Sequence, residues 1–285
     1  MVCKNFRGLA VIALLAALQA SGQAAVVQRG TDQRAREAQR EKDQRVGDIF
    51  AAMALQPGSI VADIGAGPGF FTVRLAEAVG SGGRVFAVDV SASVLRSLRS
   101  RVEQEGLRNV EVIEGNASNP NLPEAVLDAA LIVNAYHEMT EHQAMLEHIK
   151  KALKPGGRLV IVEPISPGRR DGTREEQTRQ HEIAPGFVQQ DARSAGFDIS
   201  TLEDPFSNHH GHGSEFMIVL TRPAIAAGGA ASRLRSAEPR IRASSPKAEP
   251  PTVRPAAQGA RRDTPASRSS STRSGESWCA RTGTA

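Results

Sequence analysis

The sequence predicts an α/β domain built on a doubly wound, mostly parallel seven-stranded sheet whose last strand runs antiparallel. Two observations lead to this prediction. Short β-branched runs alternate with helical patterns between residues 59 and 221, and the first run ends in a glycine-rich turn. Ligands of such sheets bind outside the carboxyl ends of the strands, so functional residues are expected there.

Five apolar runs have the length and composition of buried parallel strands. They are Ser59–Ile64, Arg84–Val90, Val110–Ile113, Asp128–Val133 and Arg158–Val162. Two further runs, Phe197–Leu202 and Ser214–Thr221, flank a short loop and are expected to form an antiparallel pair.

Helical patterns fill most of the intervals between these runs. Ser91 is a suitable cap for the helix after the second run, and Thr140 with Gln143 predicts a capping box. That second helix is expected to stop at Lys154-Pro155-Gly156-Gly157. A third helical segment, 174–195, is expected to be interrupted at Pro185.

Residues 1–25 have the three parts of a secretory signal peptide. Lys4 and Arg7 precede ten apolar residues, Leu9–Leu18, and small residues follow up to Ala24. A run of ten is too short for a stable membrane span of about 20 residues. We therefore expect an exported protein, periplasmic or secreted. The alternatives are an uncleaved N-terminal anchor or a cytoplasmic protein.

The remaining chain divides into a charged lead-in helix at 26–44, a domain at 45–222 and a tail at 223–285. The tail holds eleven Lys and Arg against four Asp and Glu, a net charge of +7. Because the whole chain carries +4, the first 222 residues carry −3 and are mildly acidic. The tail lacks apolar clusters and is expected to be disordered. The domain shows no basic stripe, so no nucleic-acid partner is expected. The two cysteines, Cys3 and Cys279, lie outside it.

The stretch VADIGAGPGFF, Val61–Phe71, predicts a strand that turns sharply into a helix. Its glycines, Gly65, Gly67 and Gly69, allow backbone amides to face a ligand. The dinucleotide fingerprint G-x-G-x-x-G requires a third glycine where this chain has Phe70. A tight turn packed for structural reasons alone is the alternative.

Five motifs in order resemble the class I S-adenosylmethionine-dependent methyltransferases over residues 45–222. They are VADIGAGPGFF, FAVDV, VEVIEGNA, LDAALIVNAYHEM and LKPGGRLVIVEP. The resemblance implies a Rossmann-like fold, S-adenosyl-L-methionine as cofactor and methyl transfer to a small-molecule acceptor.

The resemblance also implies a set of cofactor-binding residues. Asp63 would contribute charge toward the cofactor's amino group, and Asp89 would accept the ribose hydroxyls, with a simple helix cap as its alternative. Asn116 stands where the family commonly places an acid against the adenine. The full set is Asp63, Gly65, Ala66, Gly67, Gly69, Asp89, Val90, Asn116, Ala117 and Asn134.

Candidate catalytic residues follow the fourth strand at Tyr136, His137 and Glu138. Methyl transfer needs a base only if the acceptor must lose a proton, and His137 has a suitable intrinsic pKa. Its alternative role is to brace the next helix, and Tyr136 can serve as a pocket wall.

A histidine cluster at 209, 210 and 212 raises the question of a metal site, but no cysteine or well-placed carboxylate completes a ligand set, so no metal is expected. His181 is expected either to reach the rim of the acceptor pocket or to be an ordinary histidine on the solvated surface. A nicotinamide-dependent oxidoreductase and a non-catalytic cofactor-binding protein remain alternative functions. The sequence indicates neither the acceptor nor the oligomeric state.

Overall fold

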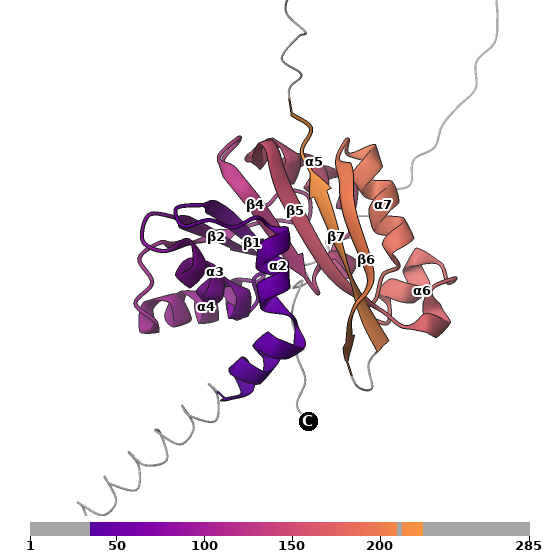
Figure 1. Ribbon diagram of the computed structural model, residues 1–285, viewed down its shortest axis with the longest axis horizontal. Coiled ribbons are helices and arrows are strands. Elements are labelled where there is room, and N and C mark those ends of the chain that lie inside the picture. The colour runs from indigo at the N-terminus through magenta and orange to yellow at the C-terminus, as the bar shows by residue number, and fades with distance from the viewer. Residues whose placement is uncertain (1–34, 210–212, 225–285) are drawn as a thin grey trace, which may run out of the picture. The chain divides into compact units, whose positions relative to one another are not determined.

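The computed structural model describes residues 35–209 and 213–224, which form a seven-stranded sheet with helices on both faces (Figure 1). The strand order is β3-β2-β1-β4-β5-β7-β6. The first five strands pair in parallel, and β7 is antiparallel to both of its neighbours. The predicted fold class is therefore confirmed.

The strands lie close to the apolar runs seen in the sequence, although two are longer. Their bounds are β1 Ile60–Ile64, β2 Arg84–Asp89, β3 Val110–Glu114, β4 Leu127–Val133, β5 Leu153–Ile165, β6 Asp198–His209 and β7 Gly213–Thr221. The α-helices are α2 Val46–Ala52, α3 Phe70–Val79, α4 Ala92–Gln104, α5 His142–Ala152, α6 Arg174–Thr178 and α7 Pro185–Ser194. Two 3₁₀ turns are η1 Tyr136–Glu138 and η2 Pro167–Arg169.

Two hydrophobic layers hold the sheet between its helices. Alternate residues along each strand point to opposite faces, so one strand serves both layers. Helices α2 and α3 pack on the face that presents Val61 and Val85. Helices α5 and α7 cover the other face, which presents Ala62 and Ile132, and α2 and α5 lie on opposite sides of the sheet in Figure 1.

The start of α5 differs from its predicted capping box. Glu141, not Thr140, is the N-cap residue, and the Gln143 side chain donates to Glu147 instead of reaching back. The predicted stop at Lys154 also comes too late. The helix ends at Ala152, because Leu153 already pairs with Leu127 and begins strand β5.

The third helical segment consists of two separate helices, α6 and α7. Pro185 is the first residue of α7 and not an interruption inside a helix. Proline is well tolerated there, because the first helical N–H has no acceptor within the helix. Gly196 ends the segment with a left-handed backbone, φ 75°.

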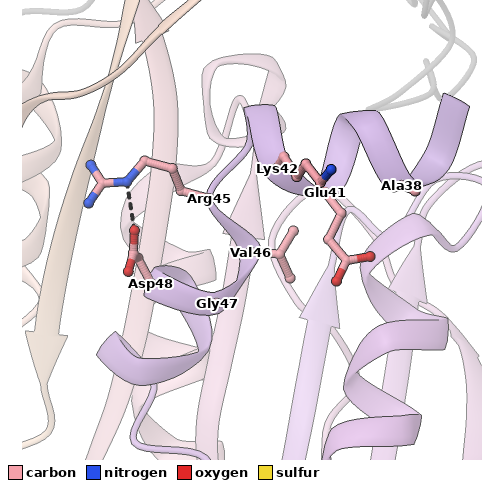
Figure 2. A pocket seen from close by; sticks show the side chains of 7 residues that line it. All are labelled: Ala38, Glu41, Lys42, Arg45, Val46, Gly47 and Asp48. Atoms are coloured by element: carbon pink, nitrogen blue, oxygen red, sulfur yellow. Dashed lines mark hydrogen bonds and ion pairs between the residues drawn. The ribbon is translucent and has the colours of Figure 1, made fainter. Parts of the chain in front are cut away.

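The lead-in region forms a helix over 35–43 that is tied to the domain by ion pairs. Glu37 binds Arg101 at 2.9 Å and lies 3.6 Å from Arg74, and the Arg74 guanidinium stacks 3.8 Å from the centre of the Phe70 ring. A shallow hollow at the junction with α2 is mostly lined by exposed residues (Figure 2). Its lining residues are Ala38, Glu41, Lys42, Arg45, Val46, Gly47 and Asp48.

Among residues 35–209 and 213–224, no helix is both long and apolar enough to cross a membrane. The predicted signal peptide at 1–25, most of the tail after Pro223 and histidines 210 and 212 lie outside the described residues.

Candidate functional site

The glycine loop joins β1 to α3 beside the point where the strand order reverses. Strands β1 and β4 are neighbours, and their carboxyl ends bring Gly65 and Ala135 into contact: a Cβ on Gly65 would lie 2.5 Å from the Cβ of Ala135. Gly65 also has φ 76°, a conformation that side chains disfavour. The predicted strand–turn–helix is confirmed at the predicted edge of the sheet.

Several amides of the loop bind the protein itself. Gly65 N and Ala66 N both donate to the Val88 carbonyl at 2.9 Å, and Gly69 N donates to the Ala66 carbonyl. Gly69 caps α3, whose first turn starts at Phe70. The first amides of a helix lack acceptors within it, so the start of α3 is the part of this loop suited to a ligand carboxylate.

Asp89 is the last residue of β2, and its carboxylate holds the glycine loop in shape by accepting a backbone hydrogen bond from it. Its Oδ2 accepts from Gly67 N at 3.1 Å and its Oδ1 accepts from Ser91 N at 2.9 Å. The side chain is buried, and burial raises its pKa while these two amides oppose the shift. The separate helix cap is Ser91, whose Oγ accepts from Val94 N, so Asp89 is not merely that cap. A carboxylate has about four acceptor positions, which leaves capacity for ribose hydroxyls.

Asp63 lies next to Asp89 in the same buried region. Its Oδ2 accepts a 2.6 Å hydrogen bond from the Thr72 hydroxyl on α3. Burial raises the pKa of Asp63 to about 6, with a further contribution from the Asp89 charge, although the Thr72 bond opposes the shift. Two carboxylates with raised pKa values therefore flank the loop, an arrangement suited to an ammonium group or hydroxyl donors.

The remaining predicted cofactor residues lie at the same edge of the sheet. Val90 follows β2, and Asn134 follows β4 with a left-handed backbone, φ 56°. Asn116 and Ala117 follow β3 and are exposed. The Asn116 Oδ1 accepts from Ser118 N, Ser118 Oγ and Asn119 N, so it stabilises its own loop, and adenine recognition through this oxygen stays a prediction.

Glu163 organises the candidate catalytic segment and was not singled out in the sequence. It is fully buried on β5, where Oε1 accepts from Ala135 N at 2.8 Å and from Tyr136 N at 2.6 Å. Its Oε2 accepts from His137 Nδ1 at 2.6 Å. A lone carboxylate in the apolar run RLVIVEPI was the available signal, because a buried charge needs partners.

His137 and Glu138 face each other beside this anchor. The His137 Nε2 lies 3.7 Å from Glu138 Oε1, and His181 Nδ1 lies 3.5 Å from the same oxygen. Burial alone would lower the pKa of His137, but the charges of Glu163 and Glu138 raise it to about 9. A base must be unprotonated when the acceptor binds, so the assignment of His137 as a base stays a prediction.

Tyr136 points into the core behind η1. Its side chain is fully buried in the layer of α5 and α7, and its hydroxyl donates to Asp191 Oδ2 at 2.8 Å. Burial raises the pKa of Tyr136 well above its usual range. The geometry makes Tyr136 a packing residue that ties η1 to α7. The sequence around Tyr136 gave no indication that Asp191 is its hydrogen-bond partner.

The part of the chain that carries this geometry is similar to known methyltransferases. Residues 61–157 match the family described as a methyltransferase domain. That segment of the chain is therefore similar to methyltransferase domains, in agreement with the resemblance of its motifs to the class I S-adenosylmethionine-dependent methyltransferases. A demethylmenaquinone methyltransferase from Geobacillus sp. (strain WCH70) is 32% identical over 120 residues, 42% of this chain and 51% of that protein. The chain thus spans about half the length of the curated relatives it matches.

Solved structures agree with the fold and with the cofactor of this family. A SAM-dependent methyltransferase from Aquifex aeolicus shares 25% identity, with a TM-score of 0.52 over 61% of this chain and 88% of that one. A putative sarcosine dimethylglycine methyltransferase from Galdieria sulphuraria is 15% identical, with a TM-score of 0.55 over 66% and 88% of the two chains, and supports the fold alone. The methyltransferase-domain match and the likeness to the Aquifex aeolicus protein support S-adenosyl-L-methionine as the cofactor.

Proposed function

We propose that this methyltransferase-family protein is an enzyme that transfers a methyl group from S-adenosylmethionine to a small-molecule acceptor. The observation that carries the proposal is the joint position of the glycine loop, Asp63 and Asp89 at the carboxyl ends of β1 and β2. The family match and the relatives described above give the nicotinamide alternative no support.

The residues present fit this cofactor. Its carboxylate would meet the first amides of α3, its ammonium group would lie toward the Asp63 carboxylate, and its ribose would bond to Asp89. The sulfonium of S-adenosylmethionine supplies an electrophilic methyl group. The work left to the protein is to position the acceptor near the end of β4 and to exclude water.

The test of cofactor binding is thermal stability with and without S-adenosylhomocysteine. Ligand at 100 times its dissociation constant should add about 2.7 kcal/mol. Asp89→Ala should weaken binding at least about tenfold, because lost bonds to a charged group cost about 1.5 to 3 kcal/mol. Since Gly67 N and Ser91 N also lose their acceptor, Asp89→Asn serves as a milder second variant.

Glu114→Ala is the matched control, because Glu114 ends the adjacent strand and pairs with Asp89 in register, yet is exposed. It should bind S-adenosylhomocysteine as the wild type does. If folded Asp89 variants kept wild-type affinity, Asp89 would not be part of the cofactor site.

Demethylmenaquinone is the acceptor to try first, because the name of the relative reported above specifies it. Incubation with methyl-tritiated S-adenosylmethionine should move label into the extracted quinone. If the label appeared instead in an unrelated amine or alcohol, the protein would still be assigned as a methyltransferase, but its acceptor would belong to another chemical class.

We also propose that the protein is exported. The support is the order of Lys4 and Arg7, the apolar run and the small residues before Val26. Cell fractionation tests this proposal, and the chain recovered from the cytoplasm alone would contradict it.

A further inference from the structure

Three potential metal ligands converge beside η1, outside the glycine loop. His137 and Glu138 come from η1, and His181 comes from the turn after α6. One atom from each lies within 4.8 Å of the others. The rings of His137 and His181 meet nearly at right angles, 82°, with centroids 5.6 Å apart.

Two buried atoms of this cluster have no hydrogen-bond partner within the described residues. They are His137 Nε2 and Glu138 Oε2. The His137 side chain is only 3% exposed, so Nε2 has little access to bulk water. A buried polar atom left unpaired costs about 1 to 3 kcal/mol, and a bound ion would remove that cost.

The orientation of His137 is the one that metal-binding histidines adopt. Its Nδ1 is held by Glu163, which leaves Nε2 directed at the cluster. A carboxylate bonded to the other ring nitrogen is the usual outer-shell partner of a ligating histidine, since it fixes the ring and increases its basicity. Glu163 is itself fixed by the amides of Ala135 and Tyr136.

We propose that His137 Nε2, the Glu138 carboxylate and His181 Nδ1 bind a divalent transition metal ion, with Zn²⁺ as the best match. Two imidazoles and one carboxylate form a recognised ligand set for zinc and leave the fourth tetrahedral position open. Hard ions such as Mg²⁺ and Ca²⁺ prefer oxygen ligands and do not suit a site with two nitrogens.

The spacing is compatible with this ion after a small closure. Ligand atoms around a tetrahedral zinc lie about 3.3 Å apart, given bonds of about 2.0 to 2.1 Å. The two distances to Glu138 Oε1 are 3.7 and 3.5 Å. The His181 side chain is 70% exposed, so its ring can move inward without disturbing the core. This proposal stands independently of methyl transfer.

The experiment is a calorimetric titration of untagged full-length protein with Zn²⁺, repeated with Co²⁺ while visible absorption is recorded. The wild type should bind one ion here, and Co²⁺ should give the absorption typical of a four-coordinate site. His181→Ala and Glu138→Gln should each weaken binding at least tenfold. The thermal midpoint of His181→Ala should match the wild type, because that side chain is exposed.

Two controls separate this site from the other histidines. His148→Ala removes a histidine on α5 that bonds to Ser118 O and Ala144 O, and it should leave Zn²⁺ affinity unchanged. Joint replacement of His209, His210 and His212 by Ala should remove any binding by that cluster and keep the site proposed here. Absence of Zn²⁺ binding, or binding lost only in the triple variant, would overturn the proposal.

Discussion

Replacement of Asp63 by Asn should change how the stability of this protein depends on pH. In the folded state Asp63 is buried against Thr72 and close to Asp89, and its pKa is raised from 3.8 to about 6. In the unfolded chain the pKa returns to about 3.9. Between these values the folded protein holds a proton that the unfolded chain releases, so the stability of the wild type falls as pH rises from about 4 to about 6.

The size of this effect follows from the shift. About two pKa units at 1.36 kcal/mol each give roughly 3 kcal/mol, of which part is already lost at pH 4. Asp63→Asn cannot ionise and should lack this loss. The variant's free energy of unfolding, relative to the wild type, should therefore increase by about 2 to 3 kcal/mol between pH 4 and pH 7.5. Any cost of replacing the carboxyl by an amide that does not depend on pH is the same at both pH values, so it cancels when the two differences are compared.

The assay is urea denaturation of both proteins at several pH values between 4 and 7.5. Glu77→Gln is the matched control, because Glu77 is an exposed carboxylate on α3, the helix that carries Thr72. Its difference from the wild type should stay constant with pH. If the difference in free energy of unfolding between Asp63→Asn and the wild type also stayed constant with pH, burial of this carboxyl would not make its ionisation costly, and the reasoning would be refuted.

Three further predictions concern other parts of the chain. If His137 acts as a base on the acceptor, His137→Gln should lower turnover by about 10² to 10⁴ while S-adenosylhomocysteine affinity stays within a few fold. Unchanged turnover would remove His137 from the chemistry. If the chain is exported as proposed, mass spectrometry of the mature protein should find an N-terminus near Val26, and an intact Met1 would argue against cleavage. Deletion of residues 224–285 should leave the thermal midpoint nearly unchanged, because the sequence of this segment lacks apolar clusters, and a lost transition would show that the segment is needed for the fold.

Much of the fold was predictable because the evidence for it is local. Buried parallel strands need continuous apolar runs, and the glycine loop needs residues that tolerate positive φ, as Gly65 does. Asp89 was also predictable, because it is the last residue of a strand and its backbone partners, Gly67 and Ser91, are fixed by the topology.

The acceptor side was less predictable because its contacts join distant segments. Glu163 binds residues 26 to 28 positions away, and Tyr136 binds Asp191 from 55 positions away. Such pairs depend on which strands become neighbours. The start of strand β5 was missed for the same reason, since the pairing of Leu153 with Leu127 outweighs the turn-forming residues that follow.

Calorimetric titration of the full chain with S-adenosylhomocysteine, and separately with NAD, tests the central claim most directly. The loop with Phe70 at the third fingerprint position, together with Asp63 and Asp89, predicts one site for S-adenosylhomocysteine and no measurable heat from NAD. Saturable binding of NAD, with none of S-adenosylhomocysteine, would contradict the assignment of this site to methyl transfer.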